Sequence, residues 1–184
     1  VEGEHDLVEE VVRMIGLDEI PAVSLPHDKF PKETLSPAQH NALIVKHELA
    51  SRGMYETVTW SFADSDLAKY FRKGGEAIIL ANPIAKELNE MRPSILPNLL
   101  TAVKNNIARG YANVSLFEVG PEFYGRHPQE QIMAASGVRC GQTSKKDWTH
   151  SNRDYDVFDA KADALAVIAA AKGPFENPQI TLDA

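Results

Sequence analysis

The sequence is poor in cysteine and in long apolar runs. Cys140 is the only cysteine among 184 residues, which excludes a disulfide framework and a cysteine-based zinc site and favours a reducing cytoplasm. No run approaches the roughly 18 apolar residues of a membrane helix. The first residues show no basic segment followed by an apolar one, so we expect neither a membrane span nor a signal peptide.

Positive charge is also scarce. The formal net charge is −7, whereas a domain that grips nucleic acid through its phosphates usually carries a basic patch. The densest basic cluster, Lys145-Lys146, stands beside Asp147 and is typical of a solvated loop. The six histidines show no paired spacing on one element, so they indicate no metal site. We therefore expect little direct contact with nucleic acid.

Four segments have the spacing and the end signals of helices. The first spans about Asp6–Met14, where Asp6 and Glu9 fit a capping box, and the others begin at Ser36, near Pro97 and near Asp156. The glycines Gly16, Gly53, Gly110 and Gly173 follow their ends. In the last helix the pattern predicts that Phe158, Leu165, Ile168 and Ala169 face inward and that Asp159 and Asp163 face solvent.

Strand signals lie between these helices. In residues 55–62 the apolar Val58, Trp60 and Phe62 alternate with polar side chains, which predicts a half-buried strand, and residues 77–80 form a short apolar run. Segments 113–124 and 131–139 are predicted antiparallel partners across a tight turn, and residues 64–71 a short helix. This order favours an α+β fold in which helices flank an antiparallel sheet. The proline-rich residues 21–35 are the candidate linker.

An acidic cluster lies in the first helix. Asp6, Glu9 and Glu10 stand at positions i, i+3 and i+4, so their carboxylates can share one helical face. Three hard oxygen donors suit Mg²⁺. Acidic residues in a first helical turn are equally explained by the helix dipole alone, and the spacing leaves both interpretations open.

Four segments together carry a specific signal. They are Asp6–Arg13 with Gly16–Pro21; Leu35–Gln39 with Arg52-Gly53 and Glu56–Phe62; Asn82–Ile84 with Met91–Leu100, Asn105 and Arg109-Gly110; and Leu116–Gly120 with Asp156–Asp163. Each motif is weak by itself, but their order and spacing are specific and cover nearly the whole chain. In this order and spacing the chain resembles one family, the bacterial phenylalanyl-tRNA synthetase β subunits.

The resemblance implies two domains. Residues 1–21 would be the last helix of a small helical module, and residues 22–184 a catalytic-like core similar to class II aminoacyl-tRNA synthetases, with a later glycine-rich segment not included. The family also implies a Mg²⁺ site at Asp6, Glu9 and Glu10, whose fourth ligand would precede Val1. The implied partners are the α subunit, other domains of β and, in the holoenzyme, tRNA(Phe).

The resemblance further implies that the core has no catalytic residues. Active class II members carry Phe-Arg-x-Glu after a strand, and the arginine grips the α-phosphate of ATP. The matching residues here are Phe123-Tyr124-Gly125-Arg126, so an uncharged tyrosine replaces that arginine. Arg92 resembles another class II arginine, and we expect it to pair with a carboxylate such as Glu90 or Glu118. We expect Glu118 to form a structural ion pair rather than act as a general base.

Three functions remain to be distinguished. The leading hypothesis is a non-catalytic scaffold that supports the α subunit in charging tRNA(Phe), with exposed apolar surface around the second helix and Trp60. The second is a stand-alone enzyme that activates a carboxylate with ATP, which needs a phosphate-binding arginine such as Arg126. The third is a Mg²⁺-dependent hydrolase that uses Asp6, Glu9 and Glu10.

Overall fold

A computed structural model describes residues 2–26, 34–144, 148–149 and 152–172. The chain divides into two compact units, Val1–Thr34 and Leu35–Ala184. The unit boundary thus falls at the end of the predicted linker 21–35, of which residues 27–33 lie outside the described part, as do Lys145-Lys146 and Gly173. No helix among the described residues is long and apolar enough to cross a membrane.

The N-terminal unit contains helix α1 (Glu4–Ile15) and the short 3₁₀ helix η1 (Leu17–Glu19). The helix begins two residues before the predicted start, and Gly3 rather than Asp6 is the N-cap. Asp6 is the third helical residue, and its carboxylate accepts hydrogen bonds from the backbone N–H groups of Glu2 (2.7 Å) and Gly3 (3.2 Å). The predicted cap at Asp6 was therefore wrong, because its side chain reaches back to donors that precede the helix.

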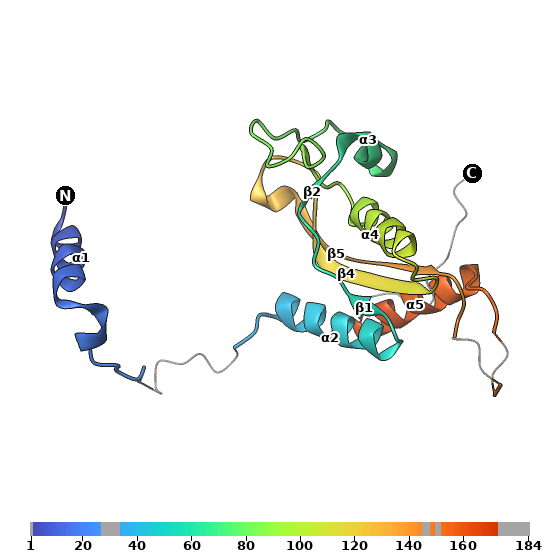
Figure 1. Ribbon diagram of the computed structural model, residues 1–184, viewed down its shortest axis with the longest axis horizontal. Helices are drawn as coiled ribbons and strands as arrows, with labels where there is room; N and C mark the ends of the chain where they lie inside the picture. The colour runs from blue at the N-terminus through green and yellow to red at the C-terminus, as the bar shows by residue number, and fades with distance from the viewer. Residues whose placement is uncertain (1, 27–33, 145–147, 150–151, 173–184) are drawn as a thin grey trace. The chain divides into compact units, whose positions relative to one another are not determined.

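The second unit is organised around a three-stranded sheet with the order β1-β4-β5 (Figure 1). Strands β4 (Val114–Phe123) and β5 (Gln131–Cys140) pair antiparallel over their full lengths, as predicted. Strand β1 (Tyr55–Glu56) instead runs parallel to β4. The sheet is mixed, so the purely antiparallel prediction was wrong. The long connection between β1 and β4 allows this, since parallel neighbours need a crossover rather than a tight turn.

Residues 55–62 do not form the single strand that their alternation predicted. Strand β1 ends at Glu56, and β2 (Phe62–Ala63) pairs antiparallel with β3 (Glu90–Met91) in a separate sheet. Between them Thr57 and Thr59 turn inward, where their hydroxyls bind the Phe117 carbonyl and the Glu118 carboxylate. Val58 and Trp60 therefore point outward, whereas Phe62 is half-buried. The expected strand 77–80 is reduced to a bridge between Ile79 and Glu90.

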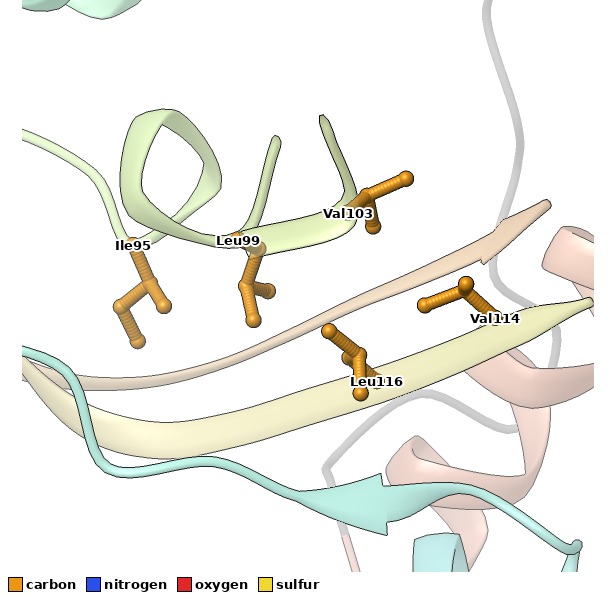
Figure 2. Close-up of a cluster of buried hydrophobic side chains, with 5 residues drawn as sticks. All are labelled: Ile95, Leu99, Val103, Val114 and Leu116. Carbon is orange, nitrogen blue, oxygen red and sulfur yellow. The ribbon is translucent and has the colours of Figure 1, made fainter. Parts of the chain in front are cut away.

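The sheet separates two apolar clusters. Helix α4 (Leu96–Ala108) covers one face, and helices α2 (Pro37–Ser51) and α5 (Val157–Ala170) lie on the other (Figure 1). Alternate side chains of β4 face opposite sides, as a pleated strand requires. Figure 2 shows the cluster on the α4 side, made of Ile95, Leu99, Val103, Val114 and Leu116. The cluster on the α2 side comprises Val45, Leu49, Met54 and Phe117.

The predicted helix starts of this unit are close to those observed. Ser36 and Gln39 form the reciprocal capping box of α2, with distances of 2.9 and 3.3 Å. The Asp156 carboxylate caps α5 by accepting from the N–H groups of Phe158 and Asp159. The predicted helix 64–71 becomes α3 (Ser65–Ala68) followed by the 3₁₀ turn η3 (Lys69–Phe71), and η4 (Pro128–Glu130) lies in the turn between β4 and β5.

Candidate functional site

The α4 face of β4 changes from apolar to charged along the strand. Val114 and Leu116 are followed at every second position by Glu118, Gly120 and Glu122, all of which are buried. Buried carboxylates are costly unless they are paired and hydrogen-bonded. The partners of these two glutamates therefore define the candidate site.

Arg92 lies at the centre of this charged region with only 1% of its surface exposed. One terminal nitrogen donates to Glu118 Oε1 at 2.7 Å and to Thr59 Oγ1 at 3.0 Å, and Nε donates to the Pro121 carbonyl at 2.9 Å. The expected pairing of Arg92 with a carboxylate is confirmed, and the partner is Glu118. Glu90 binds a different arginine, Arg72, through two bonds of 2.9 and 2.8 Å.

The second oxygen of Glu118 is also occupied. Glu118 Oε2 accepts from the Thr59 hydroxyl at 2.6 Å and from the Thr59 backbone N–H at 3.2 Å. A general base needs a free lone pair directed at a substrate proton. The hydrogen bonds of this buried carboxylate and of Arg92 all go to groups of the same chain, so the geometry favours a structural role for both residues.

Gly120 makes room for the Arg92 guanidinium. A Cβ atom at this position would lie 2.6 Å from a terminal nitrogen of Arg92, much closer than real side chains approach. We therefore expect Gly120→Ala to displace the ion pair and to lower the free energy of unfolding by about 1–3 kcal/mol, the usual cost of overpacking. Urea denaturation measures this change. Asn105→Ala, at an exposed position of α4, is the control and should stay within about 0.5 kcal/mol of the parent chain. Equal stability of both variants would contradict the expectation.

Tyr124 is engaged with a different glutamate, which the sequence did not single out. Its hydroxyl donates to Glu122 Oε2 at 2.7 Å, and Glu122 Oε1 accepts from the Ile95 N–H at 3.1 Å. The hydrogen bond to Glu122, helped by partial burial, raises the pKa of Tyr124 to about 12, so the phenol stays uncharged. Glu122 could have been found from its alternation with Glu118 along the strand.

Arg126 stands apart from these pairs. It lies in the exposed turn that follows β4, beside Tyr124 and His127 at a depression of about 270 Å³. Within the described residues no carboxylate forms an ion pair with it. The structure thus joins Arg92 to Glu118 and Tyr124 to Glu122, and leaves Arg126 outside both pairs.

The acidic residues of α1 do not gather as a metal site. Asp6 is engaged with the backbone at the helix start, and Glu10 binds Arg13 with a bond of 2.6 Å. In the described part of the chain, no three His, Cys, Asp or Glu side chains are placed to hold a metal ion. The arrangement of Asp6, Glu9 and Glu10 therefore does not fit the magnesium prediction, and we derive no chemistry from it.

A second buried ionic cluster corrects the prediction for the last helix. Asp163 is 9% exposed and accepts at 2.6 Å from Nε of both Arg52 and Arg139. The predicted solvent-facing aspartate thus ties α5 to the end of α2 and to β5. Phe158, predicted to face inward, is 71% exposed, and Asp159 binds Arg153. The apolar pattern predicted the wrong buried face because α5 carries small apolar residues on several sides, so no single apolar stripe stands out.

An apolar groove lies between residues 58–67 and helix α4. It encloses about 770 Å³ and is lined by Val58, Trp60, Leu67, Leu88, Leu100 and neighbouring polar residues. Val58 is 89% exposed, and Trp60, which is 62% exposed, stacks on Phe62 with ring centroids 6.5 Å apart. Exposed apolar side chains that cluster beside a groove mark an interaction surface. The expectation of exposed apolar surface around Trp60 is confirmed.

Comparison with known proteins gives consistent matches. Residues 20–180 match the family model described as the phenylalanyl tRNA synthetase beta chain CLM domain. The chain is 50% identical over 182 residues to the phenylalanine–tRNA ligase beta subunit of Rhodospirillum rubrum, covering 99% of this chain and 23% of that protein. The beta subunit of Paramagnetospirillum magneticum is 45% identical over 184 residues, covering all of this chain and 23% of the relative.

Solved structures share the fold at low identity. A pyrrolysyl tRNA synthetase of Desulfitobacterium hafniense superposes with a TM-score of 0.52 at 15% identity, covering 92% of this chain and 53% of that one. A histidine–tRNA ligase subunit of Alicyclobacillus acidocaldarius gives 0.50 at 13%, covering 82% and 44%. These likenesses support the predicted class II synthetase-like, mixed α and β fold. The family model spans well over half of the sequence, and the chain therefore belongs to the phenylalanyl tRNA synthetase beta chain CLM domain family.

Proposed function

We propose that this chain is a non-catalytic domain of a cytoplasmic phenylalanine–tRNA ligase β subunit, which supports an α subunit and neighbouring parts of β while the α subunit charges tRNA(Phe). Membership of the beta chain family supports this assignment. The chain spans about a quarter of the length of the curated relatives that it matches, so the domain would contribute one part of a larger assembly.

The main support for a non-catalytic role is that Arg92 is buried and already paired with a carboxylate. ATP-dependent activation needs a cation that is free to bind a phosphate. Arg92 is buried, and its nearest carboxylate lies 2.7 Å away within the same chain. Tyr124, at the position of the phosphate-binding arginine in active relatives, donates to Glu122 instead. A stand-alone carboxylate-activating enzyme is therefore not favoured, nor is a magnesium-dependent hydrolase, since the α1 carboxylates do not converge.

Calorimetric titration of the 184-residue chain with ATP tests this part of the proposal. With Mg²⁺ and phenylalanine present, we expect no heat of binding, because Arg92 and Arg72 are already paired with Glu118 and Glu90. The same preparation should co-elute with a phenylalanine–tRNA ligase α subunit in size-exclusion chromatography. Micromolar ATP binding that Arg126→Ala abolishes would overturn the non-catalytic assignment.

The groove beside Trp60 is the surface that we assign to the α subunit. Interfaces concentrate their binding energy in a few aromatic anchors next to pockets, and Trp60 is a large, exposed aromatic residue at the edge of this groove. Val58 and Leu100 extend the apolar surface on either side. The charged side chains of the groove are Asp64, Glu87 and Lys104, which fit a partner surface that places charges of opposite sign around apolar residues.

Trp60→Ala should weaken binding of the α subunit at least about tenfold, as the loss of an interface anchor does. Titration of the α subunit in surface plasmon resonance measures the affinity. Trp148→Ala is the matched control, because Trp148 is 96% exposed and lies outside the groove. Equal affinities of the two variants would remove the groove from the interface.

A further inference from the structure

We infer that Asn98 is a positioning residue, which holds the backbone of residues 59–62 so that Val58 and Trp60 are presented outward for binding. This inference rests on the proposed role of the groove. Asn98 lies in the first turn of α4 and is only partly buried. Its side-chain amide donates to the Trp60 carbonyl at 2.7 Å, the Phe62 carbonyl at 3.1 Å and Thr59 Oγ1 at 3.2 Å.

The Asn98 side-chain amide supplies hydrogen bonds of the kind that a neighbouring strand supplies in a sheet. Residues 57–61 belong to neither sheet, so their carbonyls lack the regular ladder that fixes a β-strand. The Arg92 N–H donates to the Ser61 carbonyl at 3.0 Å. The Asn98 side chain binds the Trp60 carbonyl of the segment, which the Arg92 guanidinium also reaches at 3.5 Å, and the Phe62 carbonyl at the start of β2. A helix that already packs on the sheet thereby fixes a segment that has no strand partner of its own.

The same contacts decide which way the side chains point. Thr59 is held inward by Glu118, Arg92 and Asn98, so the flanking Val58 and Trp60 face solvent by the alternation of extended backbone. Holding these anchors in their binding orientation reduces the conformational entropy lost on association. Asn98 would thus act on affinity without touching the partner.

Asn98→Ala in a Trp148→Phe background tests the inference, because Trp60 is then the only tryptophan. Time-resolved fluorescence anisotropy reports how freely Trp60 moves, and surface plasmon resonance reports affinity for the α subunit. We expect a larger fast component of the anisotropy decay and about tenfold weaker binding, with the thermal midpoint little changed. Asn106→Ala, in the same helix but outside the residues that line the groove, should leave both readouts as they are.

The outcomes separate this inference from the proposed interface. If Trp60→Ala binds normally, the interface itself is misplaced and the role of Asn98 falls with it. If Trp60→Ala binds weakly while Asn98→Ala keeps a rigid Trp60 and full affinity, the positioning role alone is overturned. Asn98→Asp preserves the shape but turns oxygens toward two carbonyls, so it should loosen Trp60 at least as much. If both Asn98 variants unfolded globally, Asn98 would be required for the stability of the whole unit, and the inferred role in positioning Trp60 would be overturned.

Discussion

Replacing Arg92 by methionine should lower the free energy of unfolding by about 3–5 kcal/mol, the usual cost of leaving a buried charge without its partner. Methionine retains much of the apolar stem, so the change mainly removes the guanidinium. Glu118, which is 4% exposed, would then keep only its bonds to Thr59. Equilibrium denaturation in urea, followed by far-ultraviolet circular dichroism, measures the loss.

Two further variants separate the orphaned carboxylate from lost packing. Adding Glu118→Gln to Arg92→Met removes the uncompensated charge and should restore part of the stability, which a double-mutant cycle measures. Arg109→Met, at an exposed position after α4, should stay within about 0.5 kcal/mol of the parent chain. If Arg92→Met were as stable as Arg109→Met, the buried pair would contribute nothing to the fold.

Asp163→Asn should destabilise the second unit by about 3 kcal/mol, because it leaves two arginines beside a neutral side chain. The carboxylate joins Arg52 near the end of α2 to Arg139 of β5, and it is the buried residue of α5. We therefore expect α5 to lose protection first, as measured by amide hydrogen exchange. Asp66→Asn, whose partner Lys69 is a surface residue, is the control. Unchanged exchange in α5 would show that apolar packing alone retains the helix.

Acid should reproduce the effect of Asp163→Asn. Burial by itself would raise the pKa of Asp163, but hydrogen bonds from Arg139 and Arg52 outweigh it and hold the pKa below the ordinary value of 3.8. A lowered folded-state pKa means that the stabilisation is complete above the unfolded-state value and is lost as the pH falls through the folded-state value. Below about pH 4 the parent chain should therefore converge in thermal midpoint on Asp163→Asn.

Local patterns predicted the parts of the fold that depend on local energetics. The capping box at Ser36, the apolar stripe of α4 and the tight connection of β4 to β5 all arise between residues that are close in sequence, so they can be read directly. The parallel pairing of β1 with Leu116 and Phe117 depends on a crossover of many residues, and no local pattern reveals its direction.

The inverted residues 57–61 show where alternation fails. A pattern of apolar residues at every second position predicts which side chains share a face, but it does not say which face is buried. Here Thr59 turns inward because Glu118, about sixty positions away, needs donors. The prediction that Asp163 faces solvent was wrong for the same reason, because its partners Arg52 and Arg139 lie far from it in sequence. Buried polar contacts are long-range, so local patterns did not reveal those of Thr59 and Asp163, whereas the pairing of Arg92 with a carboxylate was predicted through the family resemblance.

The Arg92–Glu118 pair also has a consequence for how the domain experiences its surroundings. A carboxylate attached to the same chain is present at an effective concentration that dilution does not change. Free phosphate, pyrophosphate or nucleotide would have to displace that tethered anion to reach the guanidinium, and would have to enter a buried space to do so. Glu118 therefore blocks the binding of other anions to the Arg92 guanidinium at all times. We expect the conformation of the domain to be independent of the ATP concentration in the cell.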